Sequence, residues 1–222
     1  VICGSLADEV SLFGGTPTCK RCLSQMVPVE FDRRWLTCLS EPFSGDPHPD
    51  LVLYMPFSYD SVFQKAIHKL KFERDASVAR ILGTLLGELL FQDEIQASAL
   101  VPIPLSLQRL KERGFNQAEQ IAVYASKRIE LPVLSDVLSR TKNTAPQAQL
   151  TFGEERFCNV KGAFSVNSSY SLEEMVVILV DDIATTGSTL HEAASALLYA
   201  GCAKVLCCAL SGNRNVKNAE PY

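Results

Sequence analysis

Two adjacent carboxylates stand in the stretch VVILVDDIATTGSTL at residues 176–190, after an apolar run and before a loop of hydroxyls and glycine. Asp181 and Asp182 repel one another, and they would also repel a phosphate. They therefore need another kind of partner. A sugar diol, whose two hydroxyls can each donate to a carboxylate, fits this need, and so does a hard cation such as Mg²⁺.

The residues after the acidic pair have the chemistry of a phosphate site. Gly187 permits a ligand to approach the backbone closely. Hydroxyl donors surround it at Thr185, Thr186, Ser188 and Thr189. The stretch thus predicts an anion cradle directly beside a site for a diol or a cation.

The elements around this stretch predict a βαβ unit. Residues 175–180 (MVVILV) form a continuous apolar run, as expected for a fully buried parallel strand. A helix is expected from Ser188 or Thr189 to Gly201, and a second strand at 204–210. The turn would span residues 181–187, where a strand's carboxyl end meets a helix amino end and ligands bind.

The rest of the chain alternates in the same way. An extended segment is expected at 51–60, helices at 60–72 and 76–91, and a short strand at 98–104 that Pro102 and Pro104 close. Helical sequence follows on both sides of Gly114. Strands alternating with helices predict an α/β fold with a parallel sheet covered on both faces.

Composition limits the function classes. The 222 residues are 47% hydrophobic and 21% charged, as in globular proteins, and 21 basic against 25 acidic residues give a net charge of -4. This total disfavours non-specific attraction to nucleic acid. The sequence has no apolar run of about 18 residues that could span a bilayer, and no signal-peptide pattern. We expect a cytoplasmic protein, and whether residues precede Val1 stays open.

Cysteines and turn residues divide the chain. Four of its eight cysteines lie in the first forty residues, and SGDPHPD at 44–50 has the composition of a linker. We predict a cysteine-rich domain at 1–48 and a second domain at 49–222. The later cysteines at 202, 207 and 208 lie in or beside an apolar run and are interpreted as core residues.

The order of buried strand, acidic pair, hydroxyl-rich loop and helix resembles the phosphoribosyl-pyrophosphate signature of type I phosphoribosyltransferases. The resemblance implies that Asp181 and Asp182 hold the ribose 2′ and 3′ hydroxyls. It also implies that residues Ala184 to Thr189 wrap the 5′-phosphate. The alternative is an acidic capping turn in another kind of α/β protein.

A second resemblance covers nearly the whole chain. The segments LVPIPLSLQRLKERGFNQAEQIA and RTKNTAPQAQLTFGEERFCNVKGAF, with the cysteine-rich head, resemble the ComF (GntX-like) family. In phosphoribosyltransferases the loop after the first core strand binds pyrophosphate, which implies this role for Pro104, Leu105, Ser106, Arg109 and Arg113. Lys111 is interpreted instead as part of a solvated helix face.

Two further segments resemble parts of type I phosphoribosyltransferases and of the ComF family, respectively. The stretch from Arg140 to Phe152 takes the place of the flexible hood loop, where Arg140 and Lys142 would reach the pyrophosphate, although a plain surface loop is an equal alternative. The CKRC motif of Cys19 and Cys22 resembles half of a zinc ribbon. The chain departs from the family's paired cysteines at the flanking positions, where it keeps only Cys3 and Cys38. These four cysteines still allow a structural zinc site, and reduced, unliganded thiols are the alternative.

The resemblance implies a Mg²⁺-dependent phosphoribosyltransferase in which Asp181, Asp182 and Arg113 carry the chemistry. No residue pattern identifies the acceptor. A second hypothesis is a sensor that binds phosphoribosyl pyrophosphate or a nucleotide without turnover. A third is an accessory protein for DNA uptake and natural transformation, which touches single-stranded DNA or a helicase; the sequence shows no aromatic stripe on a basic face to support it.

Overall fold

The computed structural model describes residues 2, 10–30, 34–37, 51–141 and 162–212. The strands are β1 (Val10–Phe13), β2 (Thr16–Cys19), β3 (Trp35–Thr37), β4 (Val52–Tyr54), β5 (Ala99–Pro102), β6 (Leu138–Arg140), β7 (Phe164–Val166), β8 (Val176–Ala184) and β9 (Lys204–Gly212). The helices are α1 (Lys20–Gln25), α2 (Ser61–Phe72), α3 (Ala76–Gln92), α4 (Leu107–Arg113), α5 (Gln117–Ile129) and α7 (Ser188–Tyr199).

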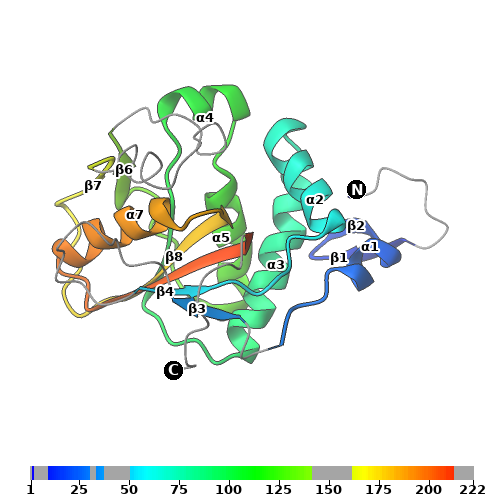
Figure 1. The fold of residues 1–222 in the computed structure, drawn as a ribbon, viewed down its shortest axis with the longest axis horizontal. Coiled ribbons are helices and arrows are strands. Elements are labelled where there is room, and N and C mark those ends of the chain that lie inside the picture. The colour runs from blue at the N-terminus through cyan, green and yellow to red at the C-terminus, as the bar shows by residue number, and fades with distance from the viewer. Residues whose placement is uncertain (1, 3–9, 31–33, 38–50, 142–161, 213–222) are drawn as a thin grey trace.

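A five-stranded sheet forms the centre of the molecule, with the strand order β3-β4-β9-β8-β5 (Figure 1). The last four strands run parallel, and β3 pairs antiparallel with β4 at one edge. Two smaller antiparallel pairs, β1-β2 and β6-β7, lie outside this sheet. The predicted α/β fold with a parallel sheet is confirmed.

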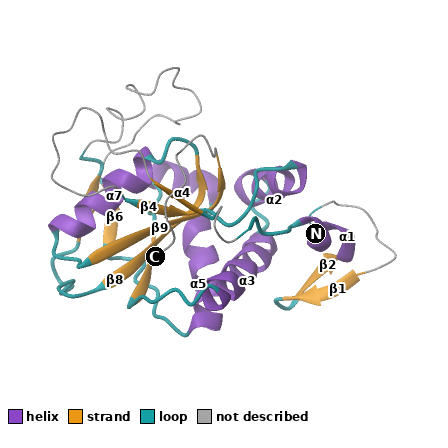
Figure 2. Cartoon of the chain, turned by 60° about the horizontal axis from the view of Figure 1, so that its bottom comes forward, coloured by secondary structure: helices purple, strands orange, loops and turns teal. Residues whose placement is uncertain are grey.

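The apolar run in β8 is buried because helices cover both faces of the sheet. Ile178 and Val180 belong to a core that includes side chains of α2, α3 and α5. Val177 and Leu179 point to the opposite face, where side chains of α7 cover them. Figure 2 shows α3 and α5 on one side of the sheet and α7 on the other. Alternate residues of one strand thus enter two different cores.

Two glycines let α3 and α5 pack closely. A Cβ on Gly83 would lie 2.5 Å from the carbonyl oxygen of Ile121, and one on Gly87 would lie 2.7 Å from that of Ala125. Any larger residue would force these helices apart. The spacing of four residues puts both glycines on one face of α3.

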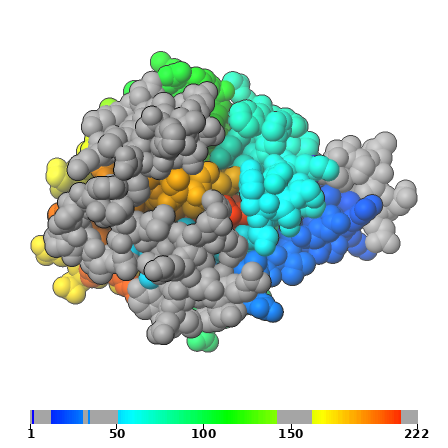
Figure 3. Space-filling model, in the orientation of Figure 1, coloured from blue at the N-terminus to red at the C-terminus, as the bar shows by residue number. Residues whose placement is uncertain are grey.

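The N-terminal segment packs against the same body. Cys19, Cys22 and Met26 share one core with residues of α2 and α3, such as Phe63 and Leu82. Figure 3 shows this segment in blue beside the cyan segment that contains α2. The division of the chain near residue 48 remains a prediction, since residues 38–50 lie outside the described part.

Helix starts follow the sequence more closely than strand ends do. α2 begins after Asp60, whose Oδ1 accepts hydrogen bonds from the N–H groups of Val62 and Phe63, each at 3.0 Å.

The turn predicted at 181–187 is wrong in its first half, because β8 continues to Ala184. The neighbouring strand β9 provides ladder partners as far as Gly212, and Asp181 pairs there with Ala209.

Within the described residues, no helix is both long enough and apolar enough to cross a bilayer.

Candidate functional site

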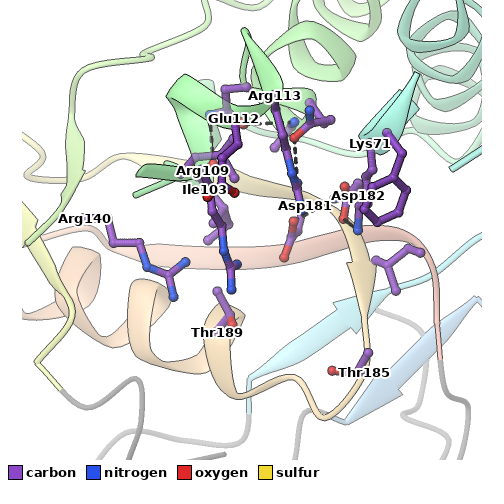
Figure 4. A pocket seen from close by; sticks show the side chains of 16 residues that line it. Lys71, Ile103, Arg109, Glu112, Arg113, Arg140, Asp181, Asp182, Thr185 and Thr189 are labelled. Atoms are coloured by element: carbon purple, nitrogen blue, oxygen red, sulfur yellow. Dashed lines mark hydrogen bonds and ion pairs between the residues drawn. The ribbon is translucent and has the colours of Figure 1, made fainter. Parts of the chain in front are cut away.

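A pocket of about 580 Å³ opens where the carboxyl ends of β5 and β8 meet the end of α2 and the start of α5 (Figure 4). Its lining is strongly charged and comes from six elements and their loops. The lining residues are Lys71, Phe72, Ile103, Leu105, Arg109, Glu112, Arg113, Asn116, Gln117, Ala118, Arg140, Asp181, Asp182, Ile183, Thr185 and Thr189.

The pocket brings together most of the predicted site. Leu105, Arg109, Arg113 and Arg140 line it with both aspartates, Thr185 and Thr189. Other predicted residues belong to the described part but not to the lining: Pro104, Ser106, Ala184, Thr186, Gly187 and Ser188. Lys142 lies outside the described residues, as does the predicted hood loop beyond Thr141.

The two aspartates lie on a strand, so their side chains point to opposite sides of it. Asp182 is buried on the side of α2, where its Oδ1 lies 2.8 Å from Nζ of Lys71. Asp181 is only partly buried, and its Oδ1 accepts the backbone N–H of Asp182 over 2.8 Å. In Figure 4 Asp181 lies between the Lys71–Asp182 pair and the side chains of Arg109 and Arg140.

Burial and the neighbouring carboxylate of Asp182 raise the pKa of Asp181 from its usual 3.8 to about 7. Lys71, the backbone N–H of Asp182 and Arg140 pull this pKa in the opposite direction. Asp181 therefore changes charge close to neutral pH. A ligand that donates hydrogen bonds to it, or brings a cation near it, will favour the ionised form.

Three arginines bring positive charge to the pocket. Arg109 and Arg113 come from α4, a short helix that has no buried residues. Three contacts hold the two ends of this helix in place. Ser106 accepts the N–H of Arg109 over 3.4 Å, and Gly114 ends the helix in a left-handed conformation with φ of 84°. The guanidinium of Arg74 donates to the carbonyl of Glu112 over 2.6 Å.

Arg109 lies close enough to Arg113 and Arg140 for their charges to interact, and carboxylates of Glu112 and the acidic pair offset part of that repulsion. Burial, and then Arg113, lower the pKa of Arg109. Burial, and then Arg109, lower the pKa of Arg140. Guanidinium groups stay charged nonetheless, so an anionic ligand would relieve the repulsion. Arg140 is the last residue of β6 and not part of a loop, which corrects the prediction for that side chain.

The loop before α7 is the segment predicted to bind phosphate. Gly187 has φ of 79°, and a Cβ there would meet no atom within 4 Å, so the backbone faces open space. Thr186 and Ser188 join their hydroxyls over 2.6 Å, and the N–H of Ser188 donates to Oγ1 of Thr186 over 3.4 Å. α7 then begins at Ser188, with its positive dipole end at the loop.

Lys71 and Phe72 are the main lining residues that sequence reasoning missed. Lys71 stands in the segment KLKFER, whose charges resemble an ordinary solvated helix end. Its ion pair depends on the crossing of α2 over the end of β8. No local pattern in the sequence contains that information.

The resemblance implies Mg²⁺ at the acidic pair and Zn²⁺ at the cysteines, and the described residues suit these two metals differently. The described ranges contain no cluster of three or more His, Cys, Asp or Glu side chains able to hold a metal. Mg²⁺ commonly uses one or two carboxylates with substrate phosphates, so the acidic pair fits it in combination with a ligand. Of the predicted zinc ligands, Cys19 and Cys22 are described and buried, whereas Cys3 and Cys38 lie outside the described residues.

Comparison with known proteins shows the class to which this fold and pocket belong. The domain family described as "Phosphoribosyl transferase domain" matches residues 80–222, which is more than half of the chain. The chain therefore belongs to the phosphoribosyltransferase family.

Named relatives narrow this class. The chain is 29% identical over 203 residues to "Competence protein F" of Haemophilus influenzae, covering 90% of this chain and 85% of that protein. It is 34% identical over 164 residues to "DNA utilization protein YhgH" of Escherichia coli, covering 72% and 71%. It is 31% identical over 148 residues to "Competence protein ComFC" of Bacillus subtilis, covering 65% and 57%. The predicted membership of the ComF group is confirmed.

Proposed function

We propose that this chain is a Mg²⁺-dependent phosphoribosyltransferase that binds phosphoribosyl pyrophosphate in the pocket. The observation that supports this most strongly is the distribution of charge. Arg109, Arg113 and Arg140 line the pocket together with the acidic pair, and Thr185 and Thr189 line it from the loop and first turn of α7. This combination of groups suits a ligand with a pyrophosphate, a sugar diol and a separate phosphate.

Each part of the ligand has a group of residues suited to it. Asp181 and Asp182 would accept hydrogen bonds from the ribose hydroxyls. The 5′-phosphate would lie against the segment 184–189, where hydroxyls, backbone N–H groups and the dipole of α7 favour negative charge. Arg109 and Arg113, with Arg140, would contact the pyrophosphate.

The reaction is a substitution at the ribose C1 atom. The lone pair of the acceptor forms the new bond to C1, and the electrons of the breaking C1–O bond leave with pyrophosphate. A proton lost by the acceptor balances the charge. The arginines stabilise the departing pyrophosphate, and the aspartates hold the ribose as positive charge develops at C1. A bound Mg²⁺ would supply further neutralisation of pyrophosphate charge.

Calorimetric titration of phosphoribosyl pyrophosphate, with and without Mg²⁺, tests the pocket. The double variant Asp181→Asn/Asp182→Asn should lose most of the affinity. Asp60→Asn is the matched control, because asparagine caps a helix as well as aspartate does, and it should bind like the wild type. Equal binding by the double variant and the wild type would exclude this pocket as the site.

Release of pyrophosphate across a panel of bases and amines separates an enzyme from a sensor. A phosphoribosyltransferase releases pyrophosphate with at least one acceptor, and the release stops in Arg113→Gln. Tight binding without release from any acceptor supports the alternative of a non-catalytic sensor for phosphoribosyl pyrophosphate or a nucleotide.

A second candidate function, in competence and DNA utilization, is suggested by the names of the relatives. One feature of the structure favours it. Arg80 and Lys127 lie over the ring of Tyr124, at 5.3 and 4.8 Å from its centroid, and Arg128 lies 3.3 Å from the centroid of Phe91. The sequence did not show this basic and aromatic face, because α3 and α5 each contribute part of it.

Basic side chains on such a face can bind single-stranded DNA through phosphate contacts. Fluorescence anisotropy with a labelled single-stranded oligonucleotide should show salt-dependent binding that weakens in Lys127→Gln. Lys65→Gln, an exposed lysine on α2, is the control. Equal affinity of both variants and the wild type would count against this face, and binding only in the presence of an added helicase would indicate a protein partner.

A further inference from the structure

The pocket has one large apolar side chain that the described fold leaves exposed. Phe72, the last residue of α2, lines the pocket and is 70% exposed. Behind it, the ring of His68, one turn earlier in the helix, lies 5.0 Å from the Phe72 ring at 42°. An exposed aromatic ring at the wall of a charged pocket offers a flat apolar surface to a ligand.

The end of α2 is held in place by contacts on both sides of Phe72. Lys71 is anchored to Asp182 by the 2.8 Å ion pair, which ties this turn of the helix to β8. Arg74, two residues further on, donates to the carbonyl of Glu112 in α4 over 2.6 Å. The Phe72 ring is thus carried by a fixed turn and not by a loose end.

The proposed reaction requires the acceptor to approach C1 from the side opposite the leaving pyrophosphate. Arg109 and Arg140 lie on one side of Asp181, and Lys71 and Asp182 lie on the other (Figure 4). Phe72 directly follows Lys71 in the chain. The end of α2 therefore forms the wall from which an acceptor would reach the sugar.

The polar side chains near this wall are already engaged in hydrogen bonds within the protein. Nδ2 of Asn116 donates to the carbonyl of Ile103 over 3.0 Å. Gln117 donates to the carbonyl of Phe115 over 3.3 Å and accepts from Arg113 over 2.9 Å. An acceptor beside them would be recognised through its flat face more than through hydrogen bonds at its edge.

We propose that Phe72 is the stacking surface for a planar heteroaromatic acceptor, such as a nucleobase, in the phosphoribosyl transfer. This inference rests on the proposed function and adds the chemical class of the second substrate. Phe72 would then bind a ligand, although its side chain is not part of the buried core of the described fold.

Product-side ligands test this without knowledge of the acceptor. Affinities for AMP, GMP, UMP and ribose 5-phosphate are measured by calorimetry in the wild type, Phe72→Leu and Phe72→Trp. In the wild type at least one nucleotide should bind about tenfold or more tightly than ribose 5-phosphate, since stacking on an aromatic ring contributes this much. Phe72→Leu should lose most of that margin, and Phe72→Trp should keep it.

Two controls separate the possible failures. Phe91→Leu removes a half-exposed ring outside the pocket and should leave all affinities unchanged. Phosphoribosyl pyrophosphate should bind equally to the wild type and Phe72→Leu, because it has no ring to stack. If the margin persists in Phe72→Leu, or no nucleotide binds more tightly than ribose 5-phosphate, the stacking role is wrong while the proposed function stands. If phosphoribosyl pyrophosphate itself does not bind, both are wrong.

Discussion

The Lys71–Asp182 ion pair allows a quantitative prediction for the change Lys71→Met. The side chains of Lys71 and Asp182 are 19% and 8% exposed, so removal of the ammonium leaves a nearly buried carboxylate without its partner. Breaking a fully buried pair in this way costs about 3–5 kcal/mol. Because Lys71 is partly exposed and the pocket admits water, we expect a loss of roughly 2 kcal/mol.

Thermal unfolding of the ligand-free protein measures this loss. For a chain of this size, 2 kcal/mol corresponds to a fall in Tm of about 4–8 °C. Lys69→Met is the matched control from the same helix, since its 3.0 Å pair with Glu73 is more exposed. That variant should stay within about 0.5 kcal/mol of the wild type.

A double-mutant cycle with Asp182→Asn isolates the interaction itself. The double variant should be more stable than the sum of the two single losses predicts, by about 1–2 kcal/mol. Purely additive losses, or a fall in Tm for Lys71→Met no larger than that for Lys69→Met, would refute the claim that this ion pair holds the end of α2 to β8.

Further predictions concern charge and metal. Because the pKa of Asp181 is raised from 3.8 to about 7, ionising it costs folding free energy, and this group's contribution to stability is lost as the pH rises through about 7. The Tm of Asp181→Asn minus that of the wild type should therefore increase as the pH rises from 5 to about 8. A Tm difference that does not change with pH would contradict the raised pKa. Arg113→Gln should weaken phosphoribosyl pyrophosphate binding about tenfold or more and ribose 5-phosphate binding little, while Lys111→Gln, exposed on the same helix, should change neither. Metal analysis tests the zinc hypothesis for the cysteine-rich segment. This hypothesis predicts about one zinc per chain, lost in Cys22→Ser and kept in Cys202→Ser. Metal-free wild-type protein would contradict it and would mean that the thiols are unliganded.

The parts of the site that lie close together in the chain could be predicted from the sequence. The acidic pair, Thr185 and Thr189 all lie within residues 181–189, and their order alone predicted a phosphate site beside a site for a diol or a cation. Arg109 and Arg113 were found because the RGFNQA segment resembles a known family. These residues are brought into one pocket as expected.

The parts that depend on crossing elements could not be predicted. Lys71 meets Asp182 only because α2 ends over β8, and the sequence shows a lysine in a charged helix end. β8 extends past the aspartates because β9 runs beside it to Gly212, and that pairing is set by the whole sheet. The ring of Tyr124 meets Arg80 because Gly83 and Gly87 let two helices approach closely.

A crystal structure of the protein with phosphoribosyl pyrophosphate and Mg²⁺ tests the central claim most directly. The account predicts density for a phosphate against residues 184–189, for a ribose beside Asp181 and Asp182, and for pyrophosphate between Arg109 and Arg113. An empty pocket at saturating ligand, or a ligand bound elsewhere in the protein, would contradict it.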